Sequence, residues 1–247
     1  MRARRISLLA VALTGLLAAT AAALQEGSRQ TSEYTLTETR AGHPTAEDFV
    51  FDYVNPDDPE AKPPAVRHVV TVLPRGGRYD ASVPASCTAT DAELTAMGGA
   101  ACPEDSAIGG GVVTVDSGTP GPARIVTADV EFFNNAEDPD GEFIYVNTIR
   151  DTGARTIIRA DVRKRRTITN AGMLPGFPPD GGAIDTVDLH VDDVRRTVDG
   201  EERAYITTPP SCRPKGTWLP RVKFTYADGV SQVVRTEVPC TGGEAAG

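Results

Sequence analysis

Short runs of alternating apolar and polar residues fill most of the chain, and clusters of Gly, Pro, Asn and Asp separate them. Alternation with a period of two puts one set of side chains on each face of an extended strand, which is typical of a half-buried antiparallel sheet. Many such runs with frequent turn signals predict an all-β sandwich or barrel rather than alternating strands and helices. We therefore expect a single β-sandwich-like domain of antiparallel strands with one short helix.

The expected strands are eleven segments: residues 33–40, 48–54, 66–73, 108–116, 123–134, 142–150, 155–163, 183–194, 203–208, 218–226 and 230–238. No low-complexity linker interrupts them, so residues 24–247 should form one unit. If the chain instead divides into two β modules, the proline-rich segment 171–182 is the expected boundary. The polar or small residues at 24–32 and 241–247 are expected to fray.

Residues 1–23 have the three parts of a secretory signal peptide. Three Arg residues lie among the first five positions, an apolar stretch follows at 6–17, and small residues occupy 18–23. We expect cleavage after Ala23, with Ala21 as the alternative. A retained anchor is the weaker interpretation, because the apolar stretch is shorter than the roughly 20 residues that span a bilayer. The mature protein is expected to be secreted or associated with the cell envelope, with no membrane span.

The charge balance limits the partners of the chain. Lys and Arg number 25 and Asp and Glu 34, a formal charge of −9. Removal of residues 1–23 takes away three of the 25 basic residues and none of the 34 acidic ones, which leaves −12. Such an acidic chain offers no large electropositive footprint for phosphates, and 6% aromatic residues provide no stacking platform for single strands. We expect no nucleic-acid partner and a monomer.

Four Cys residues follow the predicted signal peptide, at positions 87, 102, 212 and 240. An even number in an exported chain favours two disulfides, because the compartment is oxidising. Of the three possible pairings we expect Cys87–Cys102 and Cys212–Cys240, since each encloses one self-contained local motif. The alternative of four thiolates on one zinc ion lacks any C-x-x-C spacing.

The first enclosed motif is a short helix. Thr90 and Glu93 form a capping box, which predicts a helix over residues 91–97 that stops at Gly98. Closing this loop should stabilise the fold by about 3 kcal/mol in the chain-entropy model.

The second enclosed motif is a β-hairpin. Its apolar faces meet if Tyr226 opposes Val230 across a three-residue loop with Gly229 in the left-handed position. Followed back to its base, this register puts Cys240 near Gly216, just past the other cysteine.

Short motifs surround the cysteines in both regions. They are Ser86-Cys87, Ala101-Cys102-Pro103 and Ser106-Ala107-Ile108-Gly109, and then Thr208-Pro209-Pro210-Ser211-Cys212, Gly216-x-Trp218, Phe224-x-Tyr226-x-Asp228-Gly229 and Pro239-Cys240. In these motifs the chain resembles a group of exported actinobacterial β-rich proteins of unknown function, over residues 70–134 and 205–241. The resemblance implies export and the two local disulfides, and it transfers no catalytic residue.

One local cluster combines histidine with carboxylates. Asp188, His190 and Asp192 alternate with aliphatic residues, so a strand would put all three on one face. They could hold a divalent metal such as Zn²⁺ that activates water. The favoured interpretation is an ordinary solvated strand face, which needs no ligand.

Two acidic loops offer oxygen ligands for Ca²⁺, at residues 134–142 and 55–60. An EF-hand is excluded for the first, because alignment on Gly141 puts Ala136 at the first ligand position and Asn147 at the last. A hairpin connection with a type I turn over residues 138–141 explains the segment better. We therefore expect no cofactor, with Ca²⁺ or Zn²⁺ as the alternatives.

A basic cluster stands out at residues 155–166. Arg155, Arg159 and Arg163 would share one face of a strand, where they could bind an anionic envelope polymer or lipid head groups. The favoured interpretation pairs them with the protein's own carboxylates.

Sequence motifs for nucleophilic catalysis are missing: no G-x-S-x-G or H-E-x-x-H occurs, and the expected disulfides use every Cys. Gly109-Gly110-Gly111 precedes a β run, which indicates close backbone packing or a bulge rather than a phosphate loop. We expect a secreted or envelope-associated, non-catalytic binding or structural protein. The alternative is a metal-dependent hydrolase that uses Asp188, His190 and Asp192.

Overall fold

The computed structural model describes residues 27–135, 141–172, 174, 176, 181–198 and 200–242. The strands in this part are β1 (Gln30–Leu36), β2 (Glu47–Tyr53), β3 (Val66–Val72), β4 (Arg78–Tyr79), β5 (Ala107–Asp116), β6 (Ile125–Asn135), β7 (Glu142–Ile149), β8 (Arg155–Arg163), β9 (Arg166–Asn170), β10 (Ala183–Val191), β11 (Arg195–Val198), β12 (Glu201–Ala204), β13 (Ile206–Thr207), β14 (Thr217–Trp218), β15 (Arg221–Tyr226), β16 (Ser231–Arg235) and β17 (Val238–Pro239). The α-helix is α1 (Asp91–Met97), and 3-10 turns lie at Gly98–Ala101, Glu104–Ser106 and Gly121–Ala123. The chain therefore has the all-β, sandwich-like fold that its alternating pattern predicts.

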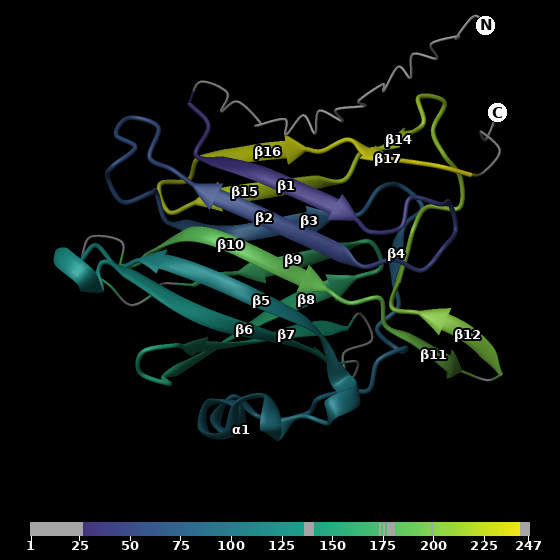
Figure 1. The fold of residues 1–247 in the computed structure, drawn as a ribbon, viewed down its shortest axis with the longest axis horizontal. Coiled ribbons are helices and arrows are strands. Elements are labelled where there is room, and N and C mark those ends of the chain that lie inside the picture. Colours follow the sequence, from purple (N-terminus) through teal and green to yellow (C-terminus); the bar gives the residue numbers. More distant parts are fainter. Residues whose placement is uncertain are drawn as a thin grey trace, which may run out of the picture.

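One sheet of eleven strands dominates the molecule, in the order β1-β2-β10-β5-β6-β7-β8-β9-β3-β15-β16. All its neighbouring strands run antiparallel, and it curls until it is nearly closed into a barrel (Figure 1). Side chains rather than a strand ladder join the two edges. The Arg29 amide donates to Gln232 Oε1 at 3.0 Å, and Gln232 Nε2 donates to the Gly27 carbonyl at 2.8 Å.

Opposite walls of the sheet touch on one side and separate on the other. Phe51 and Tyr53 of β2 pack edge-on against Phe224 of β15, with ring centroids 5.3 and 5.8 Å apart. This contact, with Val187 and Val222, gives the molecule its layered character. Strands β5 to β9 continue the sheet beyond this contact and line most of the space inside it.

Besides the hydrophobic cluster around Phe51 and Phe224, a second and larger cluster closes one end of the sheet. There the short strand pair β4 and β13 contributes Tyr79 and Ile206. Tyr205 lies beside them and packs its ring 5.9 Å from that of Phe143. We call this group, with Tyr34 of β1, the aromatic plug.

Both predicted disulfides are present, Cys87–Cys102 and Cys212–Cys240. The first encloses α1, whose capping box is formed by Thr90 and Glu93, as predicted. At the base of the second loop the Cys240 amide donates to the Gly216 carbonyl at 2.8 Å.

The predicted hairpin register is also confirmed. The Tyr226 amide donates to the Val230 carbonyl at 2.9 Å, and Gly229 has φ of 85°.

The glycine run in β5 has the predicted close backbone contact. A Cβ on Gly109 would lie 2.1 Å from the His190 carbonyl oxygen, and one on Gly111 would lie 2.1 Å from that of Asp188. The register between β5 and β6 also shifts between Ala107 and Gly109. Backbone therefore fills the space where side chains would otherwise stand.

Several expectations on element boundaries were wrong. The alternation did not reveal β9, because β8 and β9 join through the tight turn Lys164–Arg165 inside the basic run. Residues 30–32 belong to β1 rather than a frayed end, because each pairs with β2. Thr241 is likewise fixed, since its amide donates to the Thr39 carbonyl at 2.8 Å.

Three further findings concern the limits of the chain. Strands from before and after residues 171–182 pair within the one large sheet. The predicted signal peptide, residues 1–23, and the predicted turn residues 136–140 lie outside the described residues. None of the helices in the described part is long and apolar enough to cross a membrane.

Candidate functional site

An apolar cavity of about 260 Å³ lies inside the curled sheet. It is lined from eight strands: β2, β3, β5, β6, β7, β8, β9 and β10. Each strand sends its inward residues to the cavity, for example Val113 and Val115 of β5 and Leu189 and Val191 of β10. Strand alternation thus explains the lining, and the separation of the two walls explains the space.

The chemistry of the lining is almost uniform. Of the described residues that line the cavity, none is Asp, Glu, Lys, Arg or His. Most of the polar groups lie on the neighbouring strands β7, β8, β9 and β3, and the hydroxyls of Tyr145 and Thr169 lie 3.2 Å apart there. Asn147 Nδ2 donates to the Thr156 carbonyl at 3.1 Å. A mainly apolar wall with a few polar groups on one side is the usual composition of a small-molecule site.

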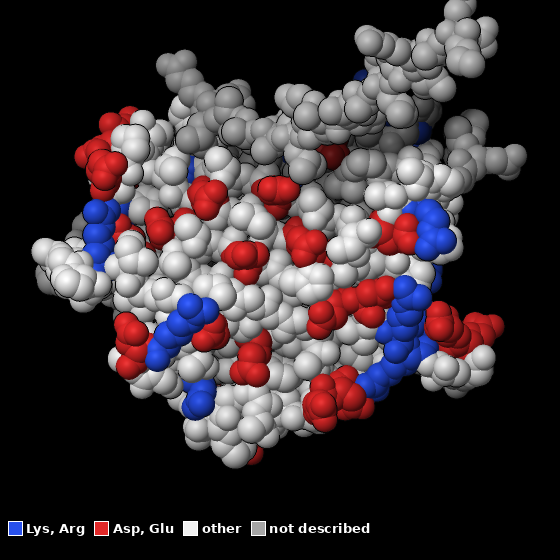
Figure 2. All heavy atoms as spheres, in the orientation of Figure 1, with Lys and Arg blue, Asp and Glu red and all other residues white. Residues whose placement is uncertain are grey.

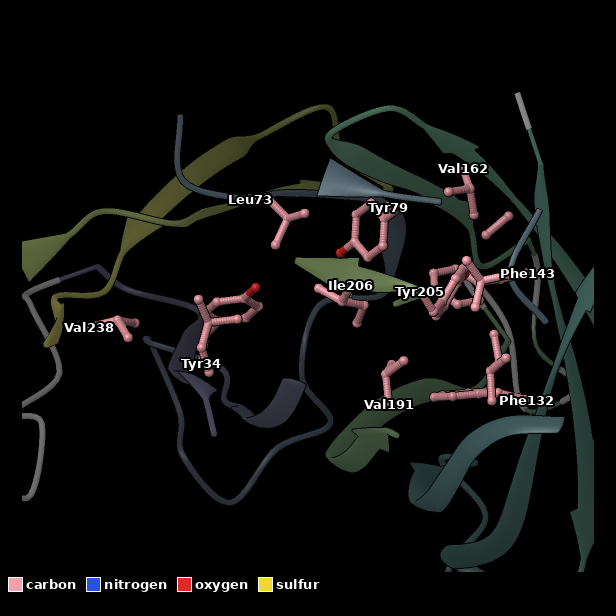
Figure 3. Packing of buried hydrophobic residues seen from close by; sticks show 14 of the residues in the cluster. Tyr34, Leu73, Tyr79, Phe132, Phe143, Val162, Val191, Tyr205, Ile206 and Val238 are labelled. Atoms are coloured by element: carbon pink, nitrogen blue, oxygen red, sulfur yellow. The ribbon is translucent and has the colours of Figure 1, made fainter. Parts of the chain in front are cut away.

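The plugged end of the cavity contains a buried carboxyl group. Glu47 is fully buried and accepts hydrogen bonds from the Tyr34 hydroxyl at 2.7 Å and the Tyr79 hydroxyl at 3.0 Å. Figure 3 shows Tyr34 and Tyr79 pointing their hydroxyls toward one another from different elements. Burial raises the pKa of Glu47 from 4.5 to about 7, and the two tyrosines only partly offset it.

Tyr205 belongs to the same plug. Its side chain is fully buried, and its hydroxyl has no hydrogen-bond partner among the described residues. Burial, and then the nearby Glu47, hold the pKa of Tyr205 well above its ordinary value. The aromatic plug is thus a closely packed group of rings that encloses the Glu47 carboxyl and the tyrosine hydroxyls.

The predicted metal ligands lie on the outside of the sheet. Asp188 and His190 are on the outer face of β10, and Asp192 follows its last residue. His190 Nδ1 lies 2.5 Å from Asp48 Oδ1 and Nε2 lies 3.2 Å from Asp192 Oδ1. Within the described ranges, no three His, Cys, Asp or Glu side chains are grouped so that they could hold a metal ion.

The surface around His190 is acidic. The outer faces of β1, β2, β10 and β6 carry Glu33, Asp48, Asp52, Asp188 and Asp129. Figure 2 shows Asp and Glu side chains scattered over this side of the molecule. The inward-facing neighbours Leu189 and Val191 line the cavity instead, so one strand serves two environments.

In the acidic loop at residues 55–60, side-chain oxygens accept hydrogen bonds from the backbone of the same loop. Asn55 Oδ1 accepts from the Asp57 amide at 3.1 Å, and Asp58 Oδ1 accepts from the Glu60 amide at 3.2 Å. The other loop proposed for Ca²⁺ falls mostly on residues 136–140, outside the described residues.

The three arginines of the predicted anion-binding row, Arg155, Arg159 and Arg163, do not act as one group. Arg159 forms ion pairs with Asp91 at 2.8 Å and Glu142 at 2.7 Å. Arg155 donates to the carbonyls of Thr95 and Ala96, both at 3.1 Å. These two residues therefore hold α1 against β8. Arg163 lies farther along the strand, 3.8 Å from Asp161.

Comparison with known proteins identifies no relative. No protein-family model matches the chain, and neither a curated protein nor a solved structure matches it. The cavity could not be predicted from the sequence, because no pattern along the chain reveals that two walls of one sheet separate.

Proposed function

We propose that this protein is a secreted or envelope-associated, non-catalytic binding protein that holds a small apolar ligand inside its sheet. The observation that carries the proposal is the 260 Å³ cavity with no charged residue among the described residues of its lining. A dry apolar cavity of about 150 Å³ is enough to bind benzene. A ligand here would be larger, with an apolar body and one polar group that faces Tyr145 and Thr169.

The expected affinity follows from the size of the ligand. A molecule of about 12 non-hydrogen atoms at about 0.6 kcal/mol per atom, between the limits for very small and drug-sized ligands, gains about 7 kcal/mol. That corresponds to a dissociation constant of about 10 µM. Binding should need no metal, because apolar burial provides the driving force.

The proposed location follows from the covalent chemistry. Two disulfides and no free cysteine among the described residues suggest an oxidising environment. Together with the signal-like segment at residues 1–23, they support a role outside the cytoplasm.

Titration with 1-aminonaphthalene, an uncharged fluorophore whose emission depends on solvent polarity, tests the proposal. Wild-type protein should give saturable, blue-shifted emission with a dissociation constant near 10 µM. Ala128→Phe should abolish it, because Ala128 lines the cavity and a ring there occupies the ligand's space.

Thr127→Phe is the matched control, since it adds the same ring on the outer face of the same strand. Its titration should match the wild type. Equal binding by both variants, or no saturable binding by the wild type, would rule out the cavity as the site.

A further inference from the structure

We infer that a second binding site, separate from the cavity, lies on the outer face of β9, β3, β15 and β16, and that it takes an extended anionic polymer. This face contains a groove of about 610 Å³. Seven of its ten lining residues are Lys or Arg, and the other three are Val. We call it the basic groove.

Strand register builds this concentration of charge. Arg166 of β9 lies opposite Val72 of β3, and Val72 lies opposite Arg221 of β15. Arg221 in turn lies opposite Arg235 of β16. With Arg163, which pairs with Arg166, the row crosses five neighbouring strands and spans about 19 Å at the usual spacing between strands.

A second row and a turn enlarge the groove. Lys223 lies opposite Val70 on one side and Val233 on the other, one step along the same face. The turn residues Lys164 and Arg165 stand at the end of the row. Their carbonyls accept from the amides of Tyr79 and Leu73, both at 3.0 Å, so the backbone of the turn is fixed in place.

Six of the seven basic residues of the groove, all except Arg163, have no carboxylate partner among the described residues. Among the ion pairs of the described residues, none involves Lys164, Arg165, Arg166, Arg221, Lys223 or Arg235. By contrast, several arginines on the other surfaces, such as Arg150 and Arg195, bind neighbouring carboxylates. Like charges directly across a sheet are destabilising, as at Arg221 and Arg235. A bound polyanion would relieve that repulsion.

The form of the groove indicates the kind of ligand. The row is linear and crosses the strands, which fits successive anionic groups on one chain better than a single small anion. The site is also hollowed, and a flexible chain can follow a hollow more closely than a flat lipid surface can. Five of the seven basic residues are Arg, whose guanidinium forks bind phosphate and carboxylate with two parallel hydrogen bonds.

Overall charge cannot explain binding to this face. The chain as a whole is acidic, with a formal charge of −9, so it repels a polyanion at long range. Retention would therefore have to come from the groove.

Calorimetric titration with long-chain sodium polyphosphate and with poly-L-glutamate tests the inference on the full mature chain. The wild type should bind at least one of these polymers, with an affinity that falls steeply as salt rises. Arg221→Gln with Lys223→Gln should weaken binding by about tenfold or more and reduce the salt dependence. The melting temperature of this variant should be unchanged or higher, because like charges have been removed.

Arg213→Gln with Lys215→Gln is the matched control, since it removes the same charge from an exposed turn outside the groove. It should bind as the wild type does. Equal losses in the two double variants would overturn the inference, as would binding of neither polymer. Binding to phosphatidylglycerol vesicles without binding to either polymer would overturn it in favour of a lipid surface.

Discussion

At the scale of single residues, Glu47 is the group whose ionisation the fold controls most strongly. Its carboxyl is fully buried, and its pKa rises from 4.5 to about 7 because burial disfavours the charged form. The folded protein therefore keeps a proton on Glu47 over a range of pH in which the unfolded chain has lost it. Folding stability must fall as pH rises through that range.

The expected result for Glu47→Gln follows from this decrease of stability with rising pH. Between pH 4.5 and about 7 the wild type should lose about 1.4 kcal/mol of unfolding free energy per pH unit through this group. Below pH 4.5 the group should contribute no slope, since both states are protonated. The variant should lack the slope, because an amide does not titrate. Urea unfolding of both proteins from pH 4 to pH 8 measures the difference, and parallel curves would contradict the assignment.

Residue patterns also show what the sequence could predict. Alternation on β10 predicted correctly that Asp188 and His190 share one face and the aliphatic residues the other. It could not reveal that His190 meets Asp48, because that contact joins residues 142 apart in the sequence. The metal assignment for this face stays an untested prediction.

At the scale of elements, α1 depends on its surroundings. Seven residues are too few for a stable isolated helix. Its capping box and the enclosing Cys87–Cys102 disulfide were both predictable from local spacing. The contacts from β8 were not, since Arg155 and Arg159 reach the helix only through the fold.

Arg159→Ala should therefore loosen α1 specifically. The variant loses the ion pairs to Asp91 and Glu142 and the hydrogen bond to the Ala89 carbonyl at 3.0 Å. Amide hydrogen exchange in α1 should accelerate by about fivefold or more, a modest effect because the pairs are partly exposed. Arg163→Ala, on the same face of β8, is the control and should leave exchange in α1 within about twofold of the wild type. Equal acceleration in both variants would show that the arginines do not hold the helix.

Strand prediction failed for a related reason. The basic run at residues 163–166 contains a complete turn, so the chain reverses where the pattern of charges suggests one continuous cluster. This reversal brings Arg166 into register with β3 and β15 and separates it from Arg155 and Arg159. The anionic-polymer site we propose therefore shares only Arg163 with the three arginines that the sequence indicated.

At the scale of the whole molecule, one curled sheet presents three different environments. Its inner face forms the apolar cavity, one outer face is acidic, and another carries the basic groove. The apolar cavity follows from the alternation of apolar and polar residues along each strand. The acidic face and the basic groove follow from which charged residues occupy the outward positions. The all-β class and the two disulfides were predictable from the sequence. The cavity was not, since a concave space depends on how distant strands meet.

The most direct test of the cavity as a binding site is the position of a bound probe. In an NMR experiment on the methyl-labelled protein with 1-aminonaphthalene, we expect intermolecular nuclear Overhauser effects to Val113, Ile158 and Leu189, which line the cavity. Effects confined to exposed methyl groups, such as those of Val50, Ile125 and Val233, would contradict the account.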